Sequence, residues 1–261
     1  MPPPAVSVIM SVRDGEKTLS RAINSILDQS FSDFEFIVIN DGSVDKTPDI
    51  IDYYAAIDKR VVAFHQDNIG LTKSLNRAIR VANGKYIARQ DADDVSLPDR
   101  LRLQFKLAES QQADMVAGDF KVVEKQSTGH MLSYVARPSS MKFLKLRMLL
   151  SGNKLAHTTL FFRRIQGLEY NEQFKYSQDF ELLLRFIRRH RKVSIVPEVV
   201  AQVHKHNTSI SSKHLLEQSD CSVKAIRMHF PGVSPLVIWF RMLIRESAFL
   251  KFAVRLRTKR Q

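Results

Sequence analysis

Residues 85–94 read KYIARQDADD, an apolar strand pattern that runs directly into three carboxylates. Lys85 to Arg89 predicts a short buried strand, and Asp91-Ala92-Asp93-Asp94 follows at its carboxyl end. Carboxylates this close repel one another, and a divalent cation relieves the repulsion. Mg²⁺ and Mn²⁺ bind such oxygens through one or two carboxylates plus substrate phosphates. The structural alternative is a solvated acidic turn before a helix that starts near Leu97-Pro98.

The segments before this stretch alternate between strand and helix patterns. The strand patterns cover Val6–Val12, Phe34–Ile39 and Val61–His65, and the helix patterns cover Glu16–Gln29, the segment opened by Thr47-Pro48, and Leu71–Val81. This alternation predicts an α/β fold in which helices flank a mostly parallel central sheet. In such sheets the ligand site lies outside the carboxyl ends of the strands.

Two further polar turns fall at that predicted edge. Asn40-Asp41-Gly42-Ser43 follows the second strand, where Asp41 can accept hydrogen bonds from a base or ribose and Gly42 permits close approach. Residues 68–76 (NIGLTKSLN) place Gly70 at a helix start and Lys73 one turn in, which suits a diphosphate. Taken alone, each pattern is more often an ordinary turn or helix cap.

The second half of the chain is less regular. Strand patterns cover Met115–Val123 and Thr158–Phe162, helix patterns cover Met141–Leu150 and Gln178–Arg189, and Val193–Val203 reads as two strand pieces around Pro197. After residue 213 the pattern is helical to the end, apart from a break near Pro231-Gly232. We find no internal repeat.

Composition places the chain among globular proteins. It has 261 residues, of which 44% are hydrophobic and 26% charged, and its single cysteine, Cys221, excludes an intrachain disulfide. Met1-Pro2-Pro3-Pro4 lacks the basic and apolar regions of a signal peptide. No apolar stretch approaches the ~18 residues of a membrane-spanning helix. We therefore expect a cytoplasmic protein.

The net charge of +13 is unevenly distributed. Residues 1–120 carry 18 acidic and 14 basic residues, so residues 121–261 carry a net charge of +17. A basic half of this kind suits nucleic acid, anionic lipid or phosphate-bearing substrates, and charge alone does not choose among them.

Residues 234–257 (SPLVIWFRMLIRESAFLKFAVRLR) predict a basic amphipathic helix. Its basic face holds Arg241, Arg245, Lys251 and Arg255, and its apolar face holds Leu236, Trp239, Leu243, Leu250 and Val254. Such a helix suits an anionic membrane interface. Packing against the main domain or in a dimer seam is the alternative. We favour peripheral attachment of residues 234–261 to the cytoplasmic face of a membrane.

Taken together, these patterns resemble one known family. Residues 7–31 (SVIMSVRDGEKTLSRAINSILDQSF), 36–47 (FIVINDGSVDKT) and 68–94 (NIGLTKSLNRAIRVANGKYIARQDADD) resemble the family-2 glycosyltransferases of the GT-A, Rossmann-like fold in order, spacing and strand context. The resemblance is close over residues 5–120 and looser to about residue 212. It implies a glycosyltransferase domain over residues 1–212, divided into a nucleotide-sugar half (1–120) and an acceptor half (121–212), followed by a basic helical tail (213–261).

The resemblance also implies roles for individual residues. The implied nucleotide and donor contacts are Ser11, Arg13, Glu16, Asp41, Gly70, Lys73, Asn76 and Asp91. The family's DxD-type motif maps onto Asp91, near the ribose, and Asp93, on the metal, and Asp91 joins Asp93 in the implied metal set. Asp94 supports them.

A later acidic pair supplies the general base in this family. The match here is Tyr176-Ser177-Gln178-Asp179-Phe180, so Asp179 is the implied base and Gln178 replaces the usual Glu. His206 aligns with a family histidine that ligates the metal or the leaving phosphate, whereas His204 stands where arginine is common. His157 resembles a frequent acceptor-side position.

The implied activity is an inverting transfer of a sugar from a nucleotide-diphosphate donor to an acceptor hydroxyl. Asp179 would take the acceptor proton, and Mn²⁺ or Mg²⁺ would neutralise the departing diphosphate. UDP is the commonest donor nucleotide in the family. Many relatives build cell-surface polysaccharide, so the implied acceptor is a saccharide, most simply a lipid-linked one.

Two other functions are weighed against this one. A sugar nucleotidyltransferase needs a glycine-rich basic loop after the first strand, and Asp14-Gly15-Glu16-Lys17 matches that loop poorly. A nucleic-acid-binding module would use the basic run at residues 185–192 (RFIRRHRK). The acidic cluster at the predicted site repels phosphate unless a metal is bound, so we expect no nucleic-acid partner.

Overall fold

The computed structural model describes residues 2–125, 131–137, 148–150, 153, 155–189, 191–205 and 214–239. Its strands are β1 (Val6–Val12), β2 (Phe34–Asp41), β3 (Val61–Gln66), β4 (Tyr86–Arg89), β5 (Val95–Ser96), β6 (Met115–Lys125), β7 (Met131–Ala136), β8 (Phe161–Arg163) and β9 (Val193–Lys205). Its helices are α1 (Leu19–Leu27), α2 (Thr47–Ile57), α3 (Leu71–Val81), α4 (Arg100–Gln111), α6 (Gln178–Arg188), α8 (Leu215–His229) and the 3-10 turn η2 (His157–Thr159).

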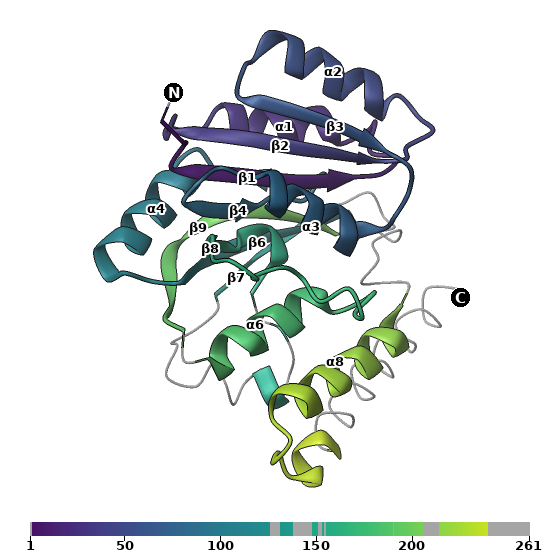
Figure 1. The fold of residues 1–261 in the computed structure, drawn as a ribbon, viewed down its shortest axis with the longest axis vertical. Coiled ribbons are helices and arrows are strands. Elements are labelled where there is room, and N and C mark those ends of the chain that lie inside the picture. The colour runs from purple at the N-terminus through teal and green to yellow at the C-terminus, as the bar shows by residue number, and fades with distance from the viewer. Residues whose placement is uncertain are drawn as a thin grey trace.

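These strands form one sheet with helices on both faces, which confirms the predicted α/β class (Figure 1). The strand order is β3-β2-β1-β4-β8-β6-β9-β5, and β7 pairs with β6. Strands β1 to β4 are parallel, with β1 between β2 and β4. Their carboxyl ends therefore meet at one edge, where the three polar segments predicted above, residues 40–43, 68–76 and 91–94, follow β2, β3 and β4. The other half of the sheet is mixed, because β8 runs antiparallel to both β4 and β6.

Alternate side chains of the parallel strands belong to two apolar clusters on opposite faces of the sheet, as expected for strands that are covered on both faces. One cluster takes Val8 and Met10 of β1 and packs against α1, α2 and α4. The other takes Ile9 of β1 and Ile39 of β2 and packs against α3, α6 and α8. In Figure 1, α1 and α2 lie at the opposite end of the molecule from α6 and α8. The helix α6, which carries Asp179, is thus fixed on the same face as α3.

Two expectations for the second half need correction. Residues 193–203 form part of one long strand, β9, rather than two pieces, because Pro197 falls at a bulge where the register shifts between Val196↔Gly118 and Val199↔Asp119. Proline has no N–H to donate, so a bulge is where a strand tolerates it. The predicted strand at 158–162 begins later, at Phe161, because Thr158 and Thr159 lie in η2 instead.

Several predictions fall outside the described residues. These are most of the helix at 141–150, the domain boundary at 212–213, His206, and the amphipathic helix from residue 240 onward. Within residues 214–239, α8 buries Ala225 and Ile226 in the same apolar cluster as α6. Val237 packs against that cluster too, whereas Leu236 and Trp239 are 73% and 59% exposed.

Candidate active site

The turns after β1 and β2 are tied to each other by hydrogen bonds that run in both directions. From the first turn, the Asp14 N–H donates to Ser43 Oγ (3.0 Å), the Gly15 N–H to Thr47 Oγ1 (2.8 Å) and the Glu16 N–H to Asp45 Oδ2 (3.0 Å). In the opposite direction, the Val44 N–H donates to Asp14 Oδ1 (2.9 Å) and the Lys46 N–H to Glu16 Oε2 (3.4 Å). These bonds make one structural unit of the two turns that were predicted to hold the nucleotide. The carboxylate of Glu16 is engaged in it.

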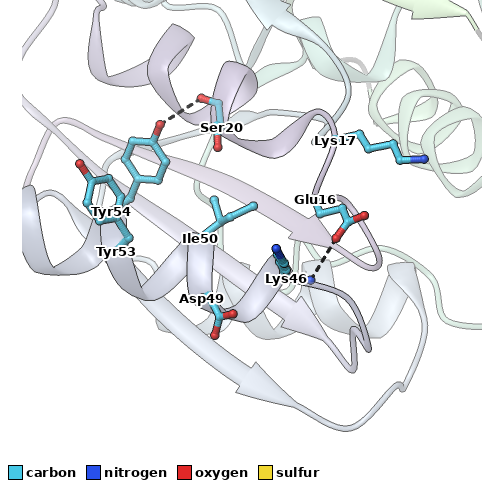
Figure 2. A pocket seen from close by; sticks show the side chains of 8 residues that line it. All are labelled: Glu16, Lys17, Ser20, Lys46, Asp49, Ile50, Tyr53 and Tyr54. Atoms are coloured by element: carbon cyan, nitrogen blue, oxygen red, sulfur yellow. Dashed lines mark hydrogen bonds between the residues drawn. The ribbon is translucent and has the colours of Figure 1, made fainter.

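Glu16 also lines a groove between α1 and α2, with a volume of about 570 Å³ (Figure 2). The groove is lined by Glu16, Lys17, Ser20, Lys46, Asp49, Ile50, Tyr53 and Tyr54. Figure 2 shows the carboxylate of Glu16 directed toward the backbone N–H of Lys46. Among the described residues, Glu16 is the only predicted site residue in this lining. The groove therefore borders the nucleotide turns from the helix side and is separate from the carboxylates predicted to do the chemistry.

Asp41 is buried at the end of β2 and organises the loop that follows β3. Its Oδ1 accepts hydrogen bonds from Gln66 Nε2 (2.9 Å) and the Ile69 N–H (2.9 Å), and its Oδ2 accepts from the Gly70 N–H (3.0 Å). Gly42 has φ +70°, and a Cβ there would lie 2.6 Å from the Asn68 nitrogen. Glycine is therefore required where this loop crosses β2. The nucleotide contact of Asp41 stays a prediction.

The other predicted donor contacts are spread along the same edge. Ser11 is buried on β1 opposite Ile39, and Arg13 is half-exposed, with its Nε 3.6 Å from Asp14 Oδ2. Lys73 is exposed in the first turn of α3. Gly70, with φ +90°, starts that helix and leaves open space where a Cβ would be.

Asn76, predicted to contact the sugar donor, is buried rather than exposed at the edge of the sheet. It is buried on α3, where its Nδ2 donates to the Tyr170 carbonyl (2.9 Å) and its Oδ1 accepts from the Tyr170 N–H (2.7 Å). The geometry gives Asn76 the role of fixing Tyr170 against α3. Its predicted place along the donor stays a prediction.

The acidic loop after β4 brings its three carboxylates together. Asp91 pairs with Arg89 (2.5 Å from Arg89 Nη2 to Asp91 Oδ1), and its N–H donates to Thr158 Oγ1 (3.3 Å). Asp94 is buried and accepts a hydrogen bond from the His204 N–H (2.9 Å). Burial raises the pKa of Asp94 well above its usual value, and the charges of Asp91 and Asp93 raise it further.

A buried arginine network that sequence reasoning missed supports this loop. Arg100 of α4 donates to Gln90 Oε1 (2.9 Å), Ser96 Oγ (2.8 Å) and the Arg89 carbonyl (2.7 Å). Gln90 Nε2 in turn donates to the carbonyls of Asp91 and Asp94 (both 3.0 Å). Burial lowers the pKa of Arg100 to about 9, and it remains the charged group at the base of the loop.

The predicted base lies in the first turn of α6, at the other side of the site. Asp179 Oδ2 accepts a hydrogen bond from Asn153 Nδ2 (2.7 Å). Nearby, His157 Nε2 and the Tyr170 hydroxyl are 2.8 Å apart. Burial lowers the pKa of His157, aided by the charge of Arg89, and burial raises the pKa of Tyr170. Asn153 and Tyr170 were not predicted, because their spacing from Asp179 shows no sequence pattern.

The charges of the acidic loop and of the predicted base act on the same two side chains. The charges of both Asp91 and Asp179 act to raise the pKa of His157 and of Tyr170, opposed by Arg89. The Asp91 N–H is bound to Thr158, the residue next to His157, so the acidic loop lies beside this pair of side chains. That Asp91 and Asp179, 88 positions apart in the sequence, serve one site stays a prediction.

Comparison with known proteins places the chain in a family. The sequence profile described as "Glycosyl transferase family 2" matches residues 7–169. The chain belongs to this family. It is therefore a glycosyltransferase, and the two alternative functions weighed above are not supported.

Relatives of this family cover most of the chain. An uncharacterized glycosyltransferase of Methanocaldococcus jannaschii is 30% identical over 237 residues, covering 88% of this chain and 81% of the relative. The O-antigen biosynthesis glycosyltransferase WbnJ of Escherichia coli is 30% identical over 228 residues, covering 85% and 87%. The putative glycosyltransferase EpsE of Bacillus subtilis is 29% identical, covering 96% and 91%.

Solved structures show the same GT-A fold at lower identity. S. aureus TarS 1–349 in complex with UDP-GlcNAc has a TM-score of 0.69 at 18% identity, over 94% of this chain and 73% of that chain. The mannosyltransferase PcManGT from Pyrobaculum calidifontis, in complex with GDP-Man and Mn²⁺, has a TM-score of 0.63 at 17% identity, over 94% and 69%. In its UDP complex, TarS 1–349 is matched over 65% of its length.

The family-2 acidic loop has the chemistry of a site for a hard cation. Among the described residues, no group of three or more His, Cys, Asp or Glu side chains is arranged to hold a metal by itself. Mg²⁺ and Mn²⁺ do not need such a cage when substrate phosphates complete the coordination. The mutual repulsion of Asp91, Asp93 and Asp94 fits an incoming cation. His206, the remaining predicted ligand, lies outside the described residues.

The search for a membrane-spanning segment is equally limited to the described residues. None of their helices combines the length and the apolar character that a bilayer crossing needs.

Proposed function

We propose that this chain is an inverting, metal-dependent glycosyltransferase that moves a sugar from a UDP-linked donor to an acceptor hydroxyl. The observation that carries the proposal is that the acidic loop and the segment facing α6 are joined: the Asp91 N–H donates to Thr158 Oγ1 (3.3 Å), and the neighbouring His157 lies 2.8 Å from the Tyr170 hydroxyl. The charges of Asp91 and Asp179 both act on these last two side chains. A displacement at a sugar carbon needs assistance at the leaving group and at the nucleophile at once. The proposal assigns the first task to the acidic loop and the second to Asp179.

Asp179 is the proposed general base. Asn153 holds its Oδ2, which leaves Oδ1 to accept the acceptor's hydroxyl proton as the oxygen attacks the anomeric carbon. Asp179 lies in the first turn of α6, at the helix N-terminus. A single in-line displacement of this kind inverts the anomeric configuration.

Asp91 and Asp93 would hold the divalent cation, Mn²⁺ or Mg²⁺. When bound, the cation neutralises the negative charge that develops on the departing nucleotide diphosphate. The Asp93 backbone carbonyl accepts a hydrogen bond from Arg21 Nη2 (3.0 Å), so the loop is anchored to α1 on the side of the nucleotide turns. The Mn²⁺ and GDP-Man of PcManGT and the UDP-GlcNAc of TarS support a metal and a nucleotide-sugar donor.

The proposed acceptor is a saccharide that is carried on a lipid. WbnJ, a relative that covers 85% of this chain, is described as an O-antigen biosynthesis enzyme, which supports a polysaccharide acceptor. The basic segment 234–261 would bring the enzyme to an anionic, cytoplasm-facing membrane surface where such an acceptor lies. The exposed Leu236 and Trp239 at the start of this segment support the same proposal.

Calorimetry of UDP binding tests the donor half of the proposal. Wild type should bind UDP tightly with Mn²⁺ and weakly with EDTA, and Asp93→Ala should bind weakly in both. Asp179→Asn is the matched control, because it should bind UDP–Mn²⁺ like wild type and yet fail to release UDP from UDP-sugars in the presence of acceptor. Binding of UDP that ignores both the metal and Asp93 would contradict the metal assignment, and no binding of UDP, GDP or dTDP would contradict the donor assignment.

A further inference from the structure

Arg89 is a fully buried arginine at the end of β4, and its guanidinium is only partly paired. Its side chain is 0% exposed, and its Nη2 donates to Asp91 Oδ1. Among the described residues, its Nε and Nη1 have no hydrogen-bond partner. A buried charge with unpaired donors costs free energy, so an apolar side chain would serve the fold better at this position. Its presence points to a task other than stability.

We propose that Arg89 is a positioning residue that holds the carboxylate of Asp91 in the orientation needed to bind the metal and the donor. The inference rests on the proposed function, because it gives Asp91 a donor-binding role. Nothing in the family match or in the names of the relatives assigns a role to Arg89.

The backbone N–H and carbonyl of Arg89 are both hydrogen-bonded, which fixes the position from which its side chain extends. The Arg89 N–H donates to the Leu160 carbonyl (2.8 Å), and the Arg89 carbonyl accepts from Arg100 Nη2 (2.7 Å). Asp91 follows two residues later, and its own N–H is bound to Thr158 Oγ1. With both main chains fixed, the bond from Arg89 to Asp91 leaves the carboxylate little rotational freedom.

The direction of the Arg89 side chain places it on the catalytic face of the sheet. Along β4, Tyr86 and Ala88 belong to the apolar cluster against α1, α2 and α4, and Ile87 belongs to the cluster against α3 and α6. By alternation, Arg89 points toward α3 and α6, the face that carries Asp179. Its charge is felt there by His157 and Tyr170.

The positive charge of Arg89 also offsets the repulsion between the carboxylates of the acidic loop. Asp91, Asp93 and Asp94 lie within four residues of one another, and their charges penalise each other. Asp91 is 28% exposed, so without Arg89 its carboxylate would be free to turn toward water and away from its neighbours. Arg89 therefore prepares Asp91 before a cation arrives, in the way that hydrogen-bonded supporting residues prepare metal ligands elsewhere.

The test compares Arg89→Met and Arg89→Lys with wild type by calorimetry of UDP in Mn²⁺ and in EDTA, and by thermal melting. Arg89→Met should raise the Kd for UDP in Mn²⁺ about 10–100-fold, the range for loss of a residue that supports a metal ligand. It should leave UDP binding in EDTA unchanged and keep the melting temperature within about 5 °C of wild type, because the unpaired buried charge is also removed. Arg89→Lys should recover part of the loss, and Arg102→Met, at an exposed arginine, should match wild type.

A double-mutant cycle isolates the action through Asp91. In an Asp91→Asn background, measured at UDP concentrations high enough to saturate it, Arg89→Met should weaken binding no further. Equal losses in both backgrounds, or wild-type binding by Arg89→Met, would overturn the inference. Should Arg89→Met fail to fold, Arg89→Lys takes its place in the cycle. Arg89→Lys should then weaken UDP binding, by a smaller factor, only where Asp91 is present and not in the Asp91→Asn background. A wild type without metal-dependent UDP binding would instead refute the proposed function itself.

Discussion

Asn153 donates a hydrogen bond to the carboxylate of Asp179, with 2.7 Å between Asn153 Nδ2 and Asp179 Oδ2. The Asn153 Oδ1 also accepts from the Leu155 N–H (2.9 Å), so the amide is held at both ends. The proposed base is thus oriented by a residue from a segment that the sequence patterns did not single out. Substitutions of Asp179, the proposed proton acceptor, and of Asn153, which orients it, should therefore lower kcat by different factors.

Asp179→Asn should lower kcat about 10²–10⁴-fold, the usual contribution of a general base, and leave UDP–Mn²⁺ binding unchanged. Asn153→Ala should lower kcat by a smaller factor, about tenfold, because the base remains and only its orientation is lost. Both are measured as steady-state release of UDP, with the exposed Asn24→Ala as control. If Asn153→Ala changes the KM for the donor and spares kcat, Asn153 does not act through Asp179.

Arg100→Met should destabilise the protein by about 3 kcal/mol, because Gln90, Ser96 and the Arg89 carbonyl would lose a buried charged donor. For a chain of this size that corresponds to a fall of roughly 6–12 °C in melting temperature. Arg102→Met, two residues along the same helix, removes an exposed arginine from an i,i+3 pair with Asp99. Its melting temperature should move by no more than about 2 °C. Similar melting temperatures for the two variants would mean that the Arg100 network is not needed for stability.

The burial of Arg89 and Arg100 is a feature that could not be predicted from the sequence. The helix Leu71–Val81 was predicted with the bounds that the structure has, because its apolar spacing and the Gly70 start are local signals. Arg89 was read only as the last residue of a strand. Whether an arginine at a strand end is solvated or buried depends on β8 and α6, whose chain segments come more than 70 residues later. Burial of charge is a tertiary property, and one strand pattern does not encode it.

The same distinction separates the parts of the site. The three polar turns were predicted from the rule that parallel strands end at one edge, and the structure gathers them there. The hydrogen bonds of Asp41 to residues 66–70, and of Asn76 to Tyr170, were not foreseen. Each joins a side chain to the backbone of another loop, so each depends on how loops cross rather than on residue type.

Gly42→Ala should weaken UDP binding about tenfold or more, because it forces a Cβ to within 2.6 Å of the Asn68 nitrogen and displaces the loop that Asp41 holds. Gly167→Ala is the matched control. It has a similar positive φ of +74° but no atom within 4 Å of the added Cβ, so it bears only the ~1–2 kcal/mol cost of the left-handed conformation. Calorimetry should show an unchanged Kd for Gly167→Ala, and an unchanged Kd for Gly42→Ala would remove the loop from the nucleotide site.

Asp58→Asn should lower stability at pH 7 by about 1–2 kcal/mol, because Asp58 accepts charge-assisted hydrogen bonds from Arg60. These bonds lower the pKa of Asp58 below its usual 3.8. A lowered folded-state pKa gives stability that is present above pH 3.8 and is lost as the pH falls through the folded value. The difference between Asp58→Asn and wild type in urea unfolding should therefore vanish toward pH 2. A difference that persists there would mean that the carboxylate charge does not cause it.

Removal of residues 240–261 should abolish binding to vesicles of anionic lipid and leave UDP–Mn²⁺ binding intact, because the residues proposed to bind the nucleotide and the metal all lie before residue 95. Trp239 and Val237 are retained in this truncation, so the packing of Val237 against the core is preserved. Binding of the full chain should weaken as salt increases, since Arg and Lys side chains attract the lipid charge through a screened field. Replacement of Arg241, Arg245 and Lys251 by Glu should mimic the truncation in sedimentation with phosphatidylserine vesicles, and Glu246→Gln should not. If the truncated chain still sediments with the vesicles, the membrane contact lies in the domain itself, and residues 240–261 have another role.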